Sequence, residues 1–141
     1  FFLTWLRHPV QRLISHYYYW MRETSFSEDE TLRRKVIHEG WSLERFCLSE
    51  ELRDIYSRFL WGFPLRRFNF IGITEFFNED MKFFSEEIFG SDVKIKPINL
   101  NPDRDEKTYA IDDTFKKEIE NFHKKDMALY EEALALRLLR L

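Results

Sequence analysis

The sequence predicts an α/β fold in which helices outnumber a few short strands. Two apolar runs, 1–6 and 68–74, have the length and the β-branched and aromatic composition of buried strands. Most other segments repeat apolar residues every three or four positions, as one face of a helix does. The 141 residues suit one domain, and fifteen Phe, six Tyr and four Trp supply a large aromatic core.

The first predicted strand passes directly into a helix. Arg7 ends the apolar run, and Pro9 can begin the helix because the first helical residue needs no N–H. One helix face is expected to be apolar and the other polar, with Val10, Leu13, Ile14, Tyr17 and Met21 on the first and Gln11, Arg12, Ser15, His16 and Tyr19 on the second. An arginine beside the positive end of a helix favours an anion, most naturally a phosphate.

The segment RHPVQRLISHYYYW, residues 7–20, resembles the 3′-phosphate-binding segment of sulfotransferases that use 3′-phosphoadenosine 5′-phosphosulfate (PAPS). The family pattern Arg-x-Pro-x-x-Arg-x-x-Ser-x-Tyr is filled here by Arg7, Pro9, Arg12, Ser15 and Tyr17. The similarity is to the carbohydrate type, as in heparan sulfate 2-O-sulfotransferases. It continues more weakly through residues 67–81, 99–107 and 126–133.

The resemblance implies a P-loop-like α/β fold with a short parallel sheet, and an enzyme that moves a sulfuryl group from PAPS to a carbohydrate hydroxyl without a metal. Arg7 and Ser15 would grip the 3′-phosphate. Further implied contacts are Arg12, Arg104 and Lys107 for the cofactor, and His16, Tyr19, Asn99 and Asn101 for the acceptor. No catalytic base is assigned, because the base of the family usually lies upstream of this segment.

Glycines are sparse in this chain. Its four glycines are isolated, so the Gly-rich loop that holds the 5′-phosphosulfate in the family is missing. Residues 1–141 are therefore expected to form a partial, truncated sulfotransferase domain that follows this loop.

Composition excludes some classes of protein and favours others. A net charge of −3 and a pI near 5.9 argue against general nucleic-acid binding. The single cysteine, Cys47, has no metal-ligand spacing around it and is expected to fill the core. No apolar run is long enough to span a bilayer. We expect a cytoplasmic, bacterial protein, with the Golgi lumen as the location of an animal relative.

Two alternatives to the enzyme remain open. The chain can be a noncatalytic module that binds an anion, a nucleotide or a glycan. It can also be a helical interaction domain in which the Arg-x-Pro motif is coincidental, and that class predicts no nucleotide binding.

The middle of the chain predicts a series of helices. Ser27 and Glu30 have the spacing of a capping box, which would open a helix that ends near His38 before Gly40. A short helix is expected at 42–48, and another from Ser49 through Trp61 with an apolar face of Leu52, Ile55, Phe59 and Leu60. The charged residues here are expected to face solvent: Arg33, Arg34, Lys35, Arg45 and Arg53.

The remaining chain alternates one strand with helices. The run 68–74 reads as a strand covered on both faces, in which Gly72 indicates close approach of another backbone or a ligand, or equally a bulge. Asn78 is expected to cap a helix 79–89 that stops at Gly90. After a loop, 91–112, a helix capped by Asp112 or Asp113 and a final helix follow. His123, between charged neighbours, is expected at the surface.

Overall fold

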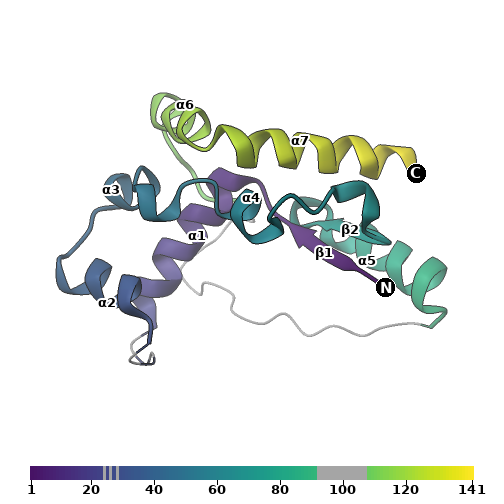
Figure 1. Ribbon diagram of the computed structural model, residues 1–141, viewed down its shortest axis with the longest axis horizontal. Coiled ribbons are helices and arrows are strands. Elements are labelled where there is room, and N and C mark those ends of the chain that lie inside the picture. The colour runs from purple at the N-terminus through teal and green to yellow at the C-terminus, as the bar shows by residue number, and fades with distance from the viewer. Residues whose placement is uncertain (24, 26, 28, 92–107) are drawn as a thin grey trace. The chain divides into compact units, whose positions relative to one another are not determined.

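A computed structural model describes residues 1–141 except 24, 26, 28 and 92–107 (Figure 1). The described part is an α/β protein, mostly helical, with two short strands. The α-helices and strands are β1 (Leu3–Leu6), α1 (Pro9–Arg22), α2 (Thr31–His38), α3 (Leu43–Cys47), α4 (Ile55–Leu60), β2 (Phe70–Ile73), α5 (Phe77–Phe83), α6 (Asp113–Phe122) and α7 (Lys124–Leu139). Short 3₁₀ segments lie at Glu50–Leu52, Leu65–Arg67 and Thr74–Phe76, and a π-helix, η4, at Phe84–Phe89.

The chain forms two compact units, each built from separate stretches of sequence. Residues Phe1–His8, Ile55–Ile98 and Lys125–Leu141 form the first, called here the sheet unit because it holds both strands. Residues Pro9–Asp54 and Asn99–Lys124 form the second, called the helical unit.

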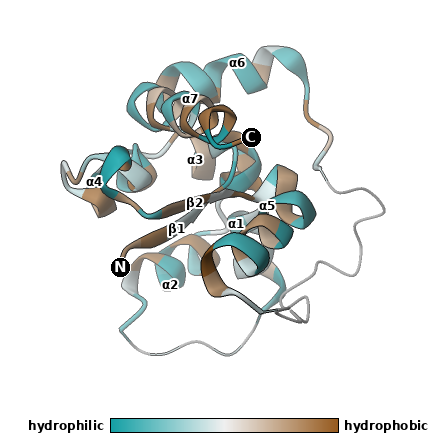
Figure 2. Ribbon diagram, turned by 90° about the vertical axis from the view of Figure 1, so that its right-hand side faces the viewer, coloured by the Kyte–Doolittle hydropathy of each residue, from teal (hydrophilic) through white to brown (hydrophobic). Residues whose placement is uncertain are grey.

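The sheet unit is built on a parallel pair of strands. β1 and β2 pair in register from Leu3 opposite Phe70 to Leu6 opposite Ile73. Both predicted strands are therefore confirmed, shorter than their apolar runs. Every residue of β2 is buried, as expected for a strand covered on both faces, and Figure 2 shows both strands in hydrophobic colours. The core of this unit consists of Leu6, Leu65, Ile71, Ile73, Tyr130 and Ala133.

At Gly72 the side chain of Trp5 in β1 closely approaches the backbone of β2. Trp5 lies directly opposite Gly72 in the register. A Cβ built on Gly72 would lie only 2.3 Å from the Trp5 ring, so glycine is what allows the indole to cross this strand. The ring also contacts Phe70 and Phe77, with centroids 5.6 and 5.1 Å apart. The sequence predicted that another backbone or a ligand approaches this glycine, or that it marks a bulge, whereas the approaching group is the Trp5 side chain.

A buried ion cluster joins β2, α5 and the end of α7. The carboxylate of Asp80, 1 % exposed, accepts a hydrogen bond from the N–H of Ile73 at 2.7 Å. The same carboxylate lies 2.7 Å from Nε of Arg137 and 2.6 Å from Nη2 of Arg140. Asp80 therefore ties the chain's last helix to the end of β2.

Two helix boundaries in the sheet unit differ from the prediction. The helix expected from Asn78 begins at Phe77 without a side-chain cap, because a 3₁₀ turn after β2 already leads the backbone into it. Gly90, at φ +67°, ends the π-helix as expected. The helix predicted from Ser49 to Trp61 is wrong as one element, because Asp54 adopts a left-handed φ of +50° that separates Glu50–Leu52 from α4. Phe59, placed on its apolar face by the prediction, is 80 % exposed.

The helical unit packs α1 against α2, α3 and α6. Val10, Leu13 and Ile14 are buried, which confirms the first turns of the predicted apolar face, whereas Met21 is exposed. α6 is capped as predicted, with the carboxylate of Asp112 accepting from the N–H of Phe115 at 3.1 Å.

The predicted capping box in the helical unit is wrong. α2 starts at Thr31 with Glu30 at its cap position, and no side chain caps it. Ser27 instead accepts a backbone hydrogen bond from Glu30 through its carbonyl, in a turn that precedes the helix. The end of α2 at His38 and the left-handed Gly40 agree with the prediction.

Candidate functional site

The junction between β1 and α1 has the order that the sequence predicts. β1 ends at Leu6, Arg7 and His8 follow, and α1 begins at the buried Pro9. Arg7 is half-buried. Because Arg7 follows a parallel strand at its carboxyl end, it lies at the edge of the sheet where open α/β sheets bind ligands.

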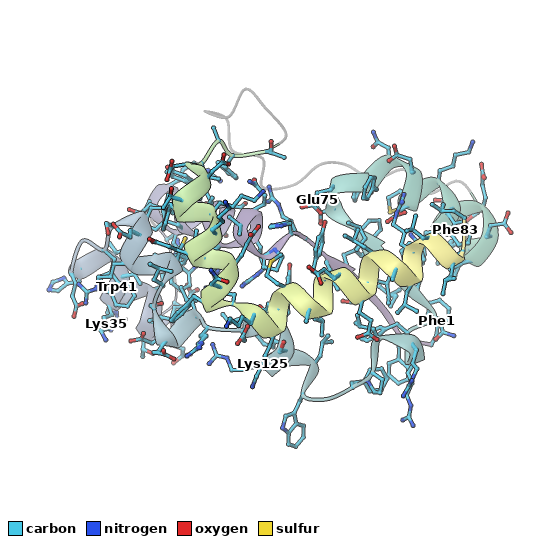
Figure 3. The ribbon with its side chains drawn as sticks, turned by 90° about the horizontal axis from the view of Figure 1, so that it is seen from above. Phe1, Lys35, Trp41, Glu75, Phe83 and Lys125 are labelled. Atoms are coloured by element: carbon cyan, nitrogen blue, oxygen red, sulfur yellow. The ribbon has the colours of Figure 1, made fainter. Side chains whose placement is uncertain are left out.

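Side chains from distant segments hold the backbone at this edge. The N–H of Arg7 donates to the Tyr56 hydroxyl at 3.1 Å, and the N–H of His8 donates to Oε1 of Glu75 at 2.9 Å. The other carboxylate oxygen of Glu75 accepts from the Tyr130 hydroxyl at 3.1 Å (Figure 3, where Glu75 is labelled). The backbone N–H groups of Arg7 and His8 therefore both donate to side chains from distant segments of the sheet unit.

Tyr130 and Glu75 act as a matched donor and acceptor. Burial, the nearby Glu75 carboxylate and the hydrogen bond to it raise the pKa of the Tyr130 hydroxyl, which stays protonated and donates. The His8 ring meets Tyr130 edge to face, with centroids 5.2 Å apart. Tyr56, Glu75 and Tyr130 were not among the site residues predicted from the sequence. The signal that was available was the position of Glu75 directly after the second predicted strand.

Tyr56 is itself fixed by a buried carboxylate. Asp126, fully buried near the start of α7, accepts hydrogen bonds from the N–H groups of Tyr56 and Ser57 at 3.0 and 2.8 Å and from the Ser57 hydroxyl at 2.9 Å. These N–H groups belong to the first turn of α4, which has no intrahelical acceptor for them. Asp126 therefore caps α4 from another helix and holds the Tyr56 ring in place.

The other described site residues lie on α1, in the helical unit. Arg12, Ser15, His16 and Tyr19 are all half-buried on this helix, as the periodicity predicts. The predicted residues Asn99, Asn101, Arg104 and Lys107 lie outside the described residues.

His16 lies in an aromatic and basic environment. Its ring meets Trp20 and Phe46 edge to face, with centroids 4.4 and 5.6 Å apart. Burial, assisted by the positive charges of Arg12 and Arg33, lowers the pKa of His16 from 6.5 to about 4. His16 is therefore neutral at pH 7, and its chemistry there is that of a hydrogen-bonding group more than of a strong base.

The lowered pKa of His16 predicts a stability that falls in mild acid. The unfolded chain binds a proton near pH 6.5 and the folded chain only near pH 4, so the free energy of unfolding should decrease as the pH drops through this window. Because the side chain is partly exposed, we expect a loss of about 1–2 kcal/mol between pH 7 and 4.5. Urea unfolding of the wild type and of His16→Gln at pH 7 and at pH 4.5 measures this loss in the free energy of unfolding. His38→Gln, which removes an exposed histidine of α2, is the control and should keep the wild-type dependence.

Arg33 is buried, so its prediction as a solvent-facing residue is wrong. It is 3 % exposed, and its guanidinium donates to Oε2 of Glu30 at 3.1 Å and to the carbonyl of Glu23 at 2.5 Å. The same group lies 5.6 Å from the centroid of the Tyr19 ring. Arg34, Lys35, Arg45 and Arg53 are exposed as predicted, and Figure 3 labels Lys35 and Trp41, whose ring lies 5.5 Å from the lysine Nζ.

His123 is fully buried, which contradicts its predicted surface position. Its Nε2 lies 2.6 Å from the carbonyl oxygen of Cys47, and its Nδ1 accepts from the N–H of Asp54 at 3.2 Å. The ring therefore connects α3 to the turn after α6. Cys47 is buried as predicted, and burial raises the pKa of its thiol to about 12, which makes it an unreactive core residue.

Comparison with known proteins adds no relative: no protein-family model, curated protein or solved structure matches the chain. Within the part of the chain that the structure describes, no helix combines the length and apolar character needed to cross a membrane.

Proposed function

We propose that the chain is part of a PAPS-dependent sulfotransferase that acts on a carbohydrate hydroxyl, and that it supplies the 3′-phosphate-binding segment. The supporting observation is the order β1, Arg7, α1, in which a parallel strand ends on an arginine and a proline-led helix carries Ser15 two turns later. This order of strand, arginine and helix is the one that the resemblance implies for such a segment.

The donor chemistry of these residues fits a phosphate. The Arg7 guanidinium offers a fork of N–H donors that matches phosphate oxygens in pairs, and the Ser15 hydroxyl adds one more donor. The carboxylate of Glu75 already accepts hydrogen bonds from the N–H of His8 and the hydroxyl of Tyr130. PAPS would bring the activated sulfuryl group and a 5′-phosphate leaving group.

The chain's own contribution would be positioning. Arg7 and Ser15 would anchor the nucleotide, with Arg12, Arg104 and Lys107 as further cofactor contacts. His16, Tyr19, Asn99 and Asn101 would meet the acceptor. Transfer of a sulfuryl group, like that of a phosphoryl group, depends mainly on alignment and on stabilising negative charge, and basic side chains supply both.

The test is calorimetric titration of the chain with adenosine 3′,5′-bisphosphate, with 5′-AMP as the comparison. We expect binding that requires the 3′-phosphate. Arg7→Ala should weaken it about 10–100-fold, since a hydrogen-bonded charge contact contributes about 1.5–3 kcal/mol. Arg7→Lys should recover only part of the loss, because an ammonium lacks the fork.

Arg34→Ala, which removes an exposed arginine of α2, is the matched control and should bind like the wild type. Equal affinity for the two nucleotides, or an Arg7→Ala variant that binds as well as the wild type, would contradict the proposal. Binding without sulfation by the full-length protein would instead favour the noncatalytic module.

A further inference from the structure

The backbone of Arg7 and His8 lies where the chain leaves the sheet unit. The pairing of β1 with β2 ends at Leu6, and His8 is the last residue of the first stretch of this unit. Backbone at the end of a strand frays easily unless other groups take over its hydrogen bonds. Two side chains of the sheet unit do so here, because Tyr56 and Glu75 accept hydrogen bonds from the two consecutive N–H groups.

The two acceptors come from different elements of the same unit. Tyr56 lies in α4, 49 residues after Arg7, and Glu75 lies in the 3₁₀ turn after β2, 67 residues after His8. The peptide unit before Arg7 and the one after it are therefore each held by a side chain. Since a peptide unit is planar, the orientations of these two units set φ and ψ of Arg7 and the direction of its Cα–Cβ bond.

Glu75 connects this backbone to the core of the sheet unit (Figure 3). Its Oε1 accepts from the N–H of His8 at 2.9 Å, and its Oε2 accepts from the hydroxyl of Tyr130 at 3.1 Å. Tyr130 is 5 % exposed, and its ring in turn meets the His8 ring edge to face. The three residues therefore form a closed set of contacts in which a buried phenol orients the carboxylate.

The exposure of Glu75 distinguishes these contacts from ordinary stabilising ones. Its side chain is exposed, and contacts of exposed charged groups add little to the free energy of unfolding. A side chain that binds a ligand, however, needs its backbone held to within a fraction of an ångström by residues around the site. Loss of Glu75 is therefore expected to affect binding more than stability.

We propose that Glu75, oriented by Tyr130, is a positioning residue that fixes the backbone of Arg7 for the binding of a phosphate group. The ligand rests on the proposed function, whereas the positioning role rests on the hydrogen bonds of two residues outside the Arg-x-Pro motif. The negative charge of Glu75 by itself would weaken the binding of an anion. Charge and positioning therefore predict opposite effects when Glu75 is removed.

The test is calorimetric titration of Glu75→Ala with adenosine 3′,5′-bisphosphate and with 5′-AMP. We expect the bisphosphate to bind about 3–10-fold more weakly than it binds to the wild type, the effect of losing one hydrogen bond. The affinity for 5′-AMP, which lacks the phosphate assigned to Arg7, should change by less than about twofold. Thermal unfolding followed by circular dichroism should show a Tm lowered by less than about 5 °C.

Three further variants make the result specific. Glu75→Gln should keep most of the affinity, because its amide oxygen can accept from His8 and its amide N–H can donate to the hydroxyl oxygen of Tyr130. Tyr130→Phe keeps the ring and removes only the hydroxyl, so it should cause a smaller loss than Glu75→Ala. Glu79→Ala removes an exposed carboxylate of α5 and should bind both nucleotides as the wild type does.

Amide hydrogen exchange in the absence of nucleotide tests the positioning step directly. The N–H of His8 should exchange more slowly in the wild type than in Glu75→Ala, and Glu75→Gln should restore its protection. Equal protection of this amide in the wild type and in Glu75→Ala would overturn the proposal, whatever the nucleotide affinities are.

The same titrations separate this proposal from the proposed function. If the wild type prefers the bisphosphate and Glu75→Ala binds it equally well or more tightly, the positioning role is overturned and the sulfotransferase proposal stands. If the wild type binds the two nucleotides equally, the sulfotransferase proposal is removed, and the phosphate-positioning role of Glu75 is removed with it.

Discussion

Asp80→Ala should be among the most destabilising single substitutions in the sheet unit, with an expected loss of about 3–5 kcal/mol in the free energy of unfolding. The buried carboxylate accepts from the N–H of Ile73 and pairs with Arg137 and Arg140. Its removal leaves the buried Arg137 Nε and the N–H of Ile73 without this acceptor, while Arg140 keeps the carbonyl of Ile71. Urea unfolding followed by circular dichroism measures the loss.

Two companion variants make the Asp80 result specific. Asp80→Asn keeps an oxygen that can accept from the N–H of Ile73 but loses the negative charge. Its free energy of unfolding should therefore lie between those of the wild type and of Asp80→Ala. Glu79→Ala removes an exposed carboxylate one residue earlier and should change stability by less than about 0.5 kcal/mol. A loss below 1 kcal/mol in Asp80→Ala would mean that the ion cluster does not hold α7 to β2.

Gly72→Val should cost about 3 kcal/mol, at the upper end for overpacking in a core. The first added carbon alone would lie 2.3 Å from two atoms of the Trp5 ring, and the ring is confined by Phe70 and Phe77. Gly72→Ala should cost less than Val but still destabilise. The measurement is the free energy of unfolding from denaturant titration.

A double-mutant cycle supplies the control for Gly72. Trp5→Leu makes room above residue 72, so the cost of Gly72→Val should be smaller in that background than in the wild type. Equal costs in the two backgrounds would show that the destabilisation does not come from contact with the indole.

Local patterns in the sequence predicted most of the backbone elements. The run before Arg7 and the run around Gly72 had strand composition, and Pro9 and Asp112 marked the starts of their helices. These signals act within a few residues of the position they describe. The exception among them is Ser27, whose spacing to Glu30 predicted a capping box that does not form, because the helix begins only at Thr31.

The sequence did not predict which polar side chains are buried. His123 stands beside two lysines, and its burial depends on the carbonyl of Cys47, 76 residues away in the chain. Arg33 lies in a charged run, and its partner is a backbone carbonyl at Glu23. The charged neighbours in the sequence predict that both side chains are exposed. Both are buried because a backbone carbonyl elsewhere in the chain accepts or shares a hydrogen bond with them.

The sequence predicted only part of the candidate site, because it shows the local order of residues but not the contacts between distant segments. The order of strand, Arg7, Pro9 and helix is local and was read directly from the sequence. The side chains that hold this junction, Tyr56 and Glu75, come from segments whose position depends on the strand register. No pattern in a single sequence states that register, so Tyr56 was missed. The position of Glu75 directly after the second predicted strand was visible, but its contacts with His8 and Tyr130 were not.

The division of the sheet unit among three stretches of sequence has a consequence for how the chain folds. β1 pairs with β2, whose residues lie about 67 positions further along the chain. Tyr130 and Ala133, which belong to the same core, lie in α7. During synthesis, at about 5–20 residues per second, the apolar β1 therefore waits several seconds before its core can close. Non-local pairing of this kind slows folding and leaves hydrophobic strands exposed to aggregation. The helical unit needs only α6 to complete its packing, so it can be finished before α7 is made.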